Sequence, residues 1–214
     1  MGVYTERILP HLMDRAMRDK ELDPIRARVA ANLTGEVLEI GFGSGLNTAL
    51  YPATVSRVLA VEPALLSRRL ADRRATAQTA EGERRSRIPV EYIGLDGQRL
   101  PLPEASVDQV LSTWTLCSIP DVARALSEIR RVLRPGGSLH FAEHGLSPDP
   151  KVARWQTRLT PIQRRVAGGC RLNLPIADLI TASGLQLTGL TNFYLHASKT
   201  AGYIYEGAAT RAAP

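Results

Sequence analysis

The sequence predicts an α/β domain with a mostly parallel seven-stranded sheet, a terminal antiparallel hairpin and helices on both faces. Short apolar runs alternate with helical stretches along the chain, which is the pattern of βαβ units. The last two apolar runs follow each other with no good helix between them, which favours a hairpin at the sheet edge. The chain has 214 residues, enough for one such domain and too few for two ordinary ones.

The seven expected strands are apolar runs bounded by turn residues. They span residues 37–40, 57–61, 90–93, 107–112, 138–143, 185–192 and 203–206. Helices are expected over residues 64–75, 122–133 and 176–182. Asp121 is placed to cap the second of these helices, and Pro135-Gly136-Gly137 is placed to end it, because proline cannot continue a helix and glycine accepts turn dihedrals.

A further helix is expected before the first strand, because apolar residues recur there at helical spacing. They are Ile8, Leu9, Leu12, Met13, Ala16 and Met17. Such a stripe suits a helix packed on the domain or a lid over a site, and a short helix on a membrane surface is the third alternative. The charged N-terminus does not resemble a signal peptide, and no segment is long and apolar enough to span a bilayer.

The composition predicts a cytoplasmic protein without structural metal. Its two cysteines, Cys117 and Cys170, show no CxxC or metal-finger spacing, which argues against a disulfide framework or a structural zinc. The net charge of +6 invites a nucleic-acid or membrane partner. Its arginine clusters, at residues 68–69, 73–74, 84–87 and 164–165, have no interleaved aromatic residues, so we expect mostly solvated surface.

A glycine-rich turn after the first strand predicts a nucleotide-sized site. Gly41, Gly43 and Gly45 let the backbone turn sharply and approach a ligand where a side chain would collide. A dinucleotide site instead has the motif G-x-G-x-x-G, and in this chain the third glycine lies one position earlier than that motif requires. The spacing therefore disfavours NAD.

Acidic residues follow three successive strands and fit one adenosyl ligand. The Glu39 carboxylate can attract the positively charged amino-acid end of a methyl donor, directly or through the loop. Glu62 can accept hydrogen bonds from both ribose hydroxyls. Asp96 can accept from the adenine amino group. Taken singly, the three glycines also suit a tight turn, Glu62 a helix cap and Asp96 a loop residue. The other residues predicted to bind this cofactor are Phe42, Ser44, Asn47, Pro63, Leu95, Gly97 and Thr113.

From about residue 37 to 143 the chain resembles the class I S-adenosylmethionine-dependent methyltransferases, which have a Rossmann-like fold. Arg131-Val132-Leu133-Arg134-Pro135-Gly136-Gly137 is similar to their helix-to-strand connection. The resemblance implies S-adenosylmethionine as cofactor and S-adenosylhomocysteine as product.

A narrower resemblance is to the methyltransferase-like thiol methyltransferases. It rests on the order and spacing of residues 115–119, 143–144, 155–156 and 168–170, and it extends to about Leu172. Members of that family carry an N-terminal membrane anchor, which we do not expect here, and an Asp at the position of Gly168.

On the acceptor side, a thiol mainly has to be a thiolate, whereas oxygen and nitrogen acceptors more often need a general base. His144 is the first candidate for that base, and a residue that orients the loop is the alternative. The other catalytic candidates are Thr113, Trp114 and Cys117, of which Trp114 either walls the methyl pocket or fills the core. Cys117 and Cys170 contact the acceptor or are simply buried.

We expect one domain over residues 1–214, with N-terminal helices or a lid over 1–32, a cofactor-binding core over 33–145, and an acceptor cover with terminal strands over 146–207. The tail, residues 208–214, is expected to fray.

The expected function is methyl transfer to a small molecule, with a thiol favoured. The alternatives are a phenol, quinone or phospholipid at a membrane surface, a nucleic-acid methyltransferase, a nicotinamide-binding oxidoreductase and a non-catalytic S-adenosylmethionine-binding protein. No nucleic-acid partner is expected, because residues 112–115 occupy the place of the Asn/Asp-Pro-Pro-aromatic loop that grips a flipped base. Peripheral membrane contact and the oligomeric state are left open.

Overall fold

A computed structural model describes residues 4–80, 88–196 and 198–213. A single seven-stranded sheet has the order β3-β2-β1-β4-β5-β7-β6, in which the first five strands are parallel and the last two are antiparallel. The strands are Gly35–Ile40 (β1), Val55–Val61 (β2), Val90–Gly94 (β3), Val107–Thr113 (β4), Leu133–His144 (β5), Leu185–Tyr194 (β6) and Tyr203–Arg211 (β7). The predicted fold, with its terminal hairpin, is confirmed.

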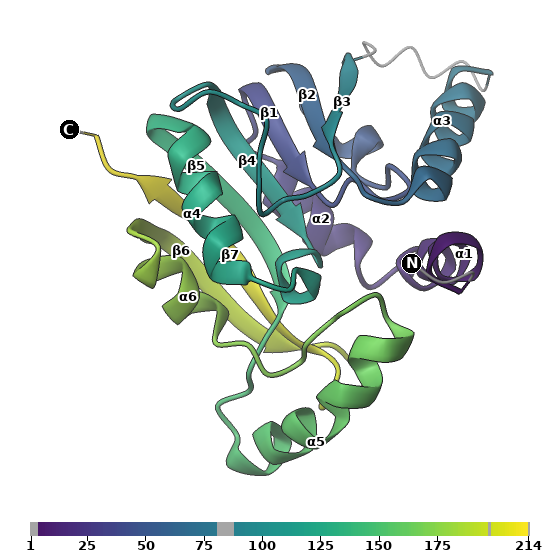
Figure 1. Ribbon diagram of the computed structural model, residues 1–214, viewed down its shortest axis with the longest axis vertical. Helices are drawn as coiled ribbons and strands as arrows, with labels where there is room; N and C mark the ends of the chain where they lie inside the picture. The colour runs from purple at the N-terminus through teal and green to yellow at the C-terminus, as the bar shows by residue number, and fades with distance from the viewer. Residues whose placement is uncertain (1–3, 81–87, 197, 214) are drawn as a thin grey trace.

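Helices cover both faces of this sheet, as Figure 1 shows. The helices are Leu9–Ala16 (α1), Asp23–Ala30 (α2), Leu65–Ala80 (α3), Val122–Val132 (α4), Pro150–Val166 (α5) and Ile176–Ala182 (α6), with short turns of helix at Tyr4–Ile8 (η1), Thr48–Leu50 (η2) and Leu116–Ser118 (η3). α4 and α6 pack on one face, while α2 and α3 pack on the other. α5 lies beyond the carboxyl end of β5 (Figure 1).

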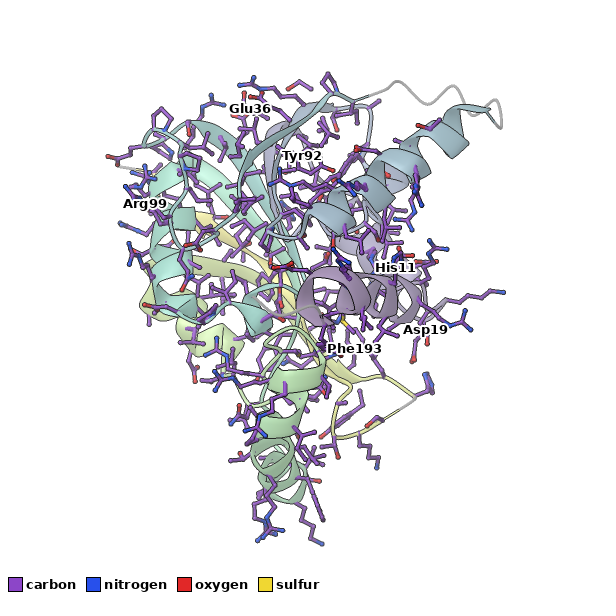
Figure 2. The ribbon with its side chains drawn as sticks, turned by 45° about the vertical axis from the view of Figure 1, so that its right-hand side comes forward. His11, Asp19, Glu36, Tyr92, Arg99 and Phe193 are labelled. Atoms are coloured by element: carbon purple, nitrogen blue, oxygen red, sulfur yellow. The ribbon has the colours of Figure 1, made fainter. Side chains whose placement is uncertain are left out.

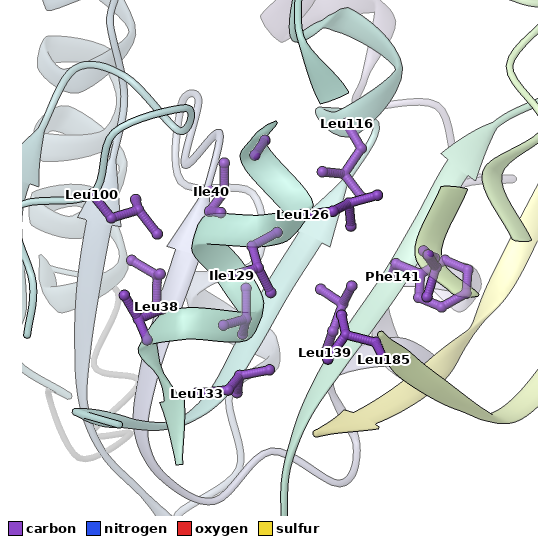
Figure 3. Packing of buried hydrophobic residues seen from close by; sticks show 14 of the residues in the cluster. Leu38, Ile40, Leu100, Leu116, Leu126, Ile129, Leu133, Leu139, Phe141 and Leu185 are labelled. Carbon is purple, nitrogen blue, oxygen red and sulfur yellow. The ribbon is translucent and has the colours of Figure 1, made fainter. Parts of the chain in front are cut away.

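Two apolar clusters, one on each face, hold these layers together. Strand side chains alternate between the faces, so Leu38 points toward α4 and Val37 points toward α2. Leu126 and Ile129 of α4 belong to the same cluster as Leu38 of β1, and Figure 3 shows Leu126 beside Leu116. Burial of these side chains on both faces explains why the parallel strands read as almost continuous apolar runs.

The structure differs from the sequence-based expectation at several element ends. α4 ends at Val132 and β5 begins at once with Leu133, so Pro135-Gly136-Gly137 lies in an irregular first part of β5, where the pairing with β4 shifts and Gly136 has a φ of 80°. Asp121 caps α4 as predicted, accepting a hydrogen bond from the Arg124 amide at 3.0 Å. α5 is a 17-residue helix that the sequence analysis left unassigned.

The expectation that the tail frays from residue 208 is wrong as far as Arg211. β7 continues to Arg211, because Ala209 is buried against α6 and the strand pairs with both β5 and β6. The arginine cluster at residues 84–87 lies outside the described residues.

Strand order reverses between β1 and β4, and we call the space beyond the carboxyl ends of these two strands the crevice. The chain runs outward from β1 to β2 and β3, then returns to β4 on the other side of β1. Ligands of open parallel sheets bind at the carboxyl ends of the strands where the order reverses in this way. The loops after β1 and β4 therefore form the expected site.

Within the described ranges, no helix combines the length and the apolar character that crossing a bilayer requires.

The packing of α4 generates a stability prediction. Ile129→Ala should lower the free energy of unfolding by about 2–5 kcal/mol, because a fully buried side chain leaves a cavity. The same substitution at Ile162, which is 59% exposed on α5, should change it by no more than about 0.5 kcal/mol. Urea unfolding followed by circular dichroism measures both, and equal losses would contradict the assignment of Ile129 to the core.

Candidate functional site at the carboxyl edge of the sheet

The glycine loop follows β1 and leaves the sheet through a left-handed turn. Gly41, Gly43 and Gly45 have φ values of 75°, 57° and 72°, which explains why glycine is used at all three positions. A Cβ atom at Gly41 would collide with the side chain of Thr115, so the loop packs directly on the segment after β4. A Cβ atom at Gly43 would meet only the Gly41 carbonyl oxygen, at 3.8 Å, so the loop faces open space there.

Glu62, at the end of β2, holds this loop in place. Its carboxylate accepts hydrogen bonds from the Gly43 amide at 2.7 Å and the Ala64 amide at 2.8 Å. Burial raises the pKa of Glu62, and these two amides oppose that rise. The residue predicted to bind a ribose therefore already joins β2 to the glycine loop.

Glu39, at the end of β1, is fully buried and turned toward α2. It accepts hydrogen bonds from Asn47 Nδ2 at 2.8 Å and from the Tyr51 hydroxyl. Burial raises its pKa to about 7, while the bonds from Tyr51 and Asn47 and the charge of Arg26 oppose the rise. With an exposed fraction of 1%, Glu39 acts on the site through Asn47.

The loop after β3 lies beside Glu62, because the Glu62 amide donates to the Gly94 carbonyl at 3.2 Å. Gly97 is close-packed, and a Cβ there would meet Ile40 at 2.9 Å. Leu95 and Asp96 are exposed, and one Asp96 oxygen accepts both donors of Gln98, from its amide at 2.8 Å and from Nε2 at 2.9 Å.

Thr113 and Trp114 end β4 on the other side of the crevice. Thr113 Oγ1 accepts a hydrogen bond from Asn47 Nδ2 at 3.0 Å, which joins β4 to the glycine loop. Trp114 has a φ of 52° and packs in the α2-side core, where the Arg26 guanidinium lies 4.8 Å from its ring centroid. Of the two alternatives for Trp114, the structure places it in the core.

Other predicted cofactor residues are placed by the same loops. Phe42 is buried edge-to-face against Tyr92, with ring centroids 5.6 Å apart, so its side chain supports the loop from behind. Ser44 is buried, and Pro63 is exposed beside Glu62.

Glu143, at the end of β5, organises the turn after β4. One carboxylate oxygen accepts from the Thr115 and Leu116 amides at 3.0 and 3.1 Å, and the other accepts from the Cys117 amide at 3.1 Å. Ser112 Oγ also donates to it, at 2.7 Å. The sequence shows Glu143 only as part of a motif, because its role depends on loops that are close only in the folded chain.

Cys117, His144 and Cys170 come together at this turn. The two sulfurs are 3.6 Å apart, and His144 Nδ1 lies 3.9 Å from Cys117 Sγ and 3.6 Å from Cys170 Sγ. The hydrogen bond between the thiols raises the pKa of Cys117, as does burial, and lowers the pKa of Cys170. The cysteines are buried and His144 is half-buried. We call these three residues the Cys–His–Cys cluster.

Two arginines of α3 reinforce the site, which sequence analysis did not predict. Arg68 donates to the Glu62 carbonyl at 2.7 Å and lies over the ring of Tyr92, labelled in Figure 2. Arg74 binds the Ser44 carbonyl and pairs with Asp14 of α1 at 2.7 Å. Arg69, Arg73, Arg164 and Arg165 are exposed, as the solvated-surface prediction states.

The pairing of Asp14 with Arg74 ties α1 to α3 and to the glycine loop, and Figure 2 shows α1 and α3 side by side. This arrangement agrees with a packed helix or lid. Leu9 is buried, whereas Ile8 and Leu12 remain about half exposed.

α5 carries an apolar face that is left in solvent near the acceptor side. Gln156 fixes the helix by donating to the Gly145 carbonyl at 2.9 Å and accepting from the Ser147 amide at 2.8 Å. The exposed large apolar side chains are Trp155, Leu159, Ile162 and Val166, at helical spacing. Basic residues flank them, and Lys151, Arg154 and Arg158 line a hollow around Trp155.

The open face of the glycine loop is accessible to a ligand. A Cβ at Gly43 would fill the space where a ligand approaches the loop. Asn47 Oδ1 is buried without a hydrogen-bond partner among the described residues, which leaves an acceptor for an ammonium group. The chemistry of the loop therefore suits the cofactor that the sequence predicts.

Known sequences similar to this chain include methyltransferases. The methyltransferase-domain family matches residues 38–141. Human thiol S-methyltransferase TMT1B is 31% identical over 179 residues, which cover 79% of this chain and 68% of the human protein. Rat TMT1B is 33% identical over 143 residues, covering 64% of this chain and 54% of the rat protein. The chain thus spans about half the length of the rat relative.

A demethylmenaquinone methyltransferase from Beutenbergia cavernae is 31% identical over 168 residues, covering 76% of this chain and 63% of that protein. Among solved structures, a possible histamine N-methyltransferase from Thermotoga maritima superposes with a TM-score of 0.68 at 18% identity, covering 98% of this chain and all of the other. The [4+2]-cyclase SpnF superposes with a TM-score of 0.66 at 18% identity, covering 90% of this chain and 80% of the other. These structures share the fold.

Gly43→Val tests the cofactor site. The branched side chain would occupy the open space before the loop, so binding of S-adenosylmethionine should weaken by about 100-fold or more in calorimetry. Gly136→Val is the matched control, since Gly136 also has a positive φ and open surroundings. It lies near the start of β5, whereas the site lies at the carboxyl ends of the strands. Its affinity should equal that of the wild type, and unchanged affinity in Gly43→Val would place the site elsewhere.

The raised pKa of Glu39 predicts a pH dependence of stability. Between about pH 4.5 and 7 the folded chain keeps a proton on Glu39 that the unfolded chain releases, so stability falls as pH rises through this window. Glu39→Gln removes this loss. Relative to wild type, the variant should gain about 3 kcal/mol in free energy of unfolding between pH 4.5 and pH 8. Urea unfolding at several pH values measures this difference. The same change of the free energy of unfolding with pH in both proteins would refute the assignment.

Proposed function

The chain belongs to the class I S-adenosylmethionine-dependent methyltransferases close to the thiol S-methyltransferases, and on that premise we propose that it methylates the sulfur of a small thiol. Membership makes it a transferase that takes its methyl group from S-adenosylmethionine. The observation that carries the choice of a thiol is the 31% identity to human thiol S-methyltransferase TMT1B over 179 residues.

The donor is assigned to the crevice between β1 and β4. Gly43 allows close approach of the ligand, and Asn47 Oδ1 accepts from the ammonium group of the amino-acid end. The two amide bonds of Glu62 use two of the about four lone-pair positions of its carboxylate, and the others accept the ribose hydroxyls. Asp96 and Leu95 are assigned to the adenine edge and face.

The acceptor is assigned to the space beside the Cys–His–Cys cluster. Cys117 of this cluster lies in the same turn as Thr115, and Thr115 packs on Gly41. The donor and the acceptor therefore meet across this one loop contact. The acceptor sulfur forms a bond to the methyl carbon while the bond from that carbon to the donor sulfonium breaks. The electron pair of the broken carbon–sulfur bond stays on the sulfur of S-adenosylhomocysteine, and the thiol proton passes to solvent. Positioning of the two partners supplies much of the rate, because the transfer must be in line.

A quinol acceptor is the second candidate. The Beutenbergia demethylmenaquinone methyltransferase is as similar to this chain as human TMT1B, at 31% identity. The exposed apolar face of α5 with its basic flanks also suits a lipophilic acceptor taken from a membrane surface. His144 would then act as the general base for the hydroxyl group.

An acceptor panel tests the proposal. The full chain is incubated with S-adenosylmethionine and alkyl thiols, phenols, quinols or phospholipids, and S-adenosylhomocysteine is quantified by mass spectrometry. Thiols should react faster than oxygen acceptors by about 100-fold or more, since the latter depend on a general base.

The Gly43→Val variant, prepared in the same way, shows whether the product arises from this protein. Product with quinols alone would support the second candidate and refute the first. No product with any acceptor would refute both.

A further inference from the structure

The Cys–His–Cys cluster has the dimensions of a metal site. Its three ligand atoms come from three separate elements: η3, the end of β5, and the loop after α5. All three lie within 4.8 Å of one another, and the two cysteines, 53 residues apart, are the only ones in the chain. The ligands have no spacing in the sequence that is typical of a metal site, so the sequence alone predicts no metal.

The distances match those of tetrahedral zinc. Zinc–sulfur bonds of about 2.3 Å and zinc–nitrogen bonds of about 2.0–2.1 Å hold two sulfurs about 3.8 Å apart and a sulfur about 3.6 Å from a nitrogen. The corresponding distances in the cluster are 3.6 Å between the sulfurs, and 3.6 and 3.9 Å from sulfur to His144 Nδ1. We propose that Cys117, His144 and Cys170 bind a zinc ion and leave its fourth position open.

Neither a disulfide nor simple apolar packing fits the cluster as well. A disulfide needs sulfurs about 2.05 Å apart, well below the 3.6 Å found here. Two buried thiols that serve only as small apolar side chains do not require an imidazole nitrogen within reach of both. Two thiolates and a neutral histidine also balance the charge of a divalent ion, which a buried site requires.

The backbone around the ligands is already held in place. The Cys117 amide donates to Glu143, and its carbonyl accepts from the Arg171 amide at 2.9 Å. The Cys170 amide donates to the Ala167 carbonyl at 3.1 Å. A Cβ at Gly169 would meet the Ser118 carbonyl at 2.8 Å, so only glycine lets the two cysteine-bearing segments approach this closely. Fixed ligand positions favour a selective site.

The open position gives the zinc a role in the reaction, an extension that rests on the proposed thiol acceptor. A site with three protein ligands keeps one position for substrate, and a thiol that coordinates a metal loses its proton. Access is from the side of His144, the one ligand that is not buried. The acceptor would therefore be bound as a thiolate beside the glycine loop, with its proton released to solvent.

The test measures zinc itself, in the full chain without an affinity tag and in reducing buffer. Metal analysis should find about one zinc per chain, and replacement by cobalt should give thiolate-to-cobalt charge-transfer absorption. Competition with a chromophoric chelator gives the zinc affinity. Cys117→Ser, Cys170→Ser and His144→Ala should each weaken it by more than about 100-fold, since even loss of an outer partner costs 10–100-fold.

Two control variants separate the site from its surroundings. Leu172→Val alters the packing around the two cysteines without removing a ligand, so its zinc affinity should stay near that of wild type. Gly43→Val loses the methyl donor and should also keep its zinc. Absence of zinc in the wild type, or equal affinity in the Cys117→Ser/Cys170→Ser double variant, would overturn the proposal.

Activity distinguishes this inference from the function on which its second part rests. Removal of zinc should abolish thiol methylation while calorimetry still detects S-adenosylmethionine binding, and added zinc should restore turnover. Thiol methylation by metal-free protein would overturn the role of zinc in the reaction and leave the proposed function standing. Zinc binding by the cluster without methylation of any thiol would support the site and overturn the thiol acceptor.

Discussion

Buried carboxylates at the carboxyl ends of the parallel strands are the constraint on which the site depends. A parallel strand that ends at a crevice leaves loop amides without ladder partners, and an unpaired buried amide is costly. Glu62 meets this need for the glycine loop, and Glu143 meets it for the turn after β4. Glu39 holds the segment after β1 in another way, by accepting hydrogen bonds from the side chains of Asn47 and Tyr51. Each carboxylate gives up solvation, so it remains bound to its loop.

These carboxylates make one rigid unit of the donor and acceptor sides. Gly41 packs on Thr115, and Asn47 joins Glu39 to Thr113 across the crevice. A shift of either loop would break buried hydrogen bonds on the other. Methyl transfer depends on in-line alignment to within a fraction of an ångström, and this arrangement supplies it from fixed strand ends rather than from mobile segments.

The acceptor side is less enclosed than the donor side. α5 is held at Gln156 but presents its apolar face to solvent, and α1 is tied through Asp14 while Leu12 stays half exposed. The N-terminal segment meets the end of α5, where the Tyr4 hydroxyl donates to the Val166 carbonyl at 2.8 Å, and Ala167 just beyond α5 packs on the two cysteines. Apolar surface left in solvent in this way is typical of interaction sites, which agrees with the lipophilic acceptor considered above.

Local chemistry is enough to predict the alternation of strands and helices, the glycine turn, the Asp121 cap and the terminal hairpin. Each follows from residues near one another in the chain, where periodicity and backbone preference act directly. Only the tertiary structure decided that Glu143 binds the turn after β4 and that Cys117 meets Cys170. Those contacts join segments dozens of residues apart, and their distances are set by sheet order and packing, which leave no spacing signal in the sequence.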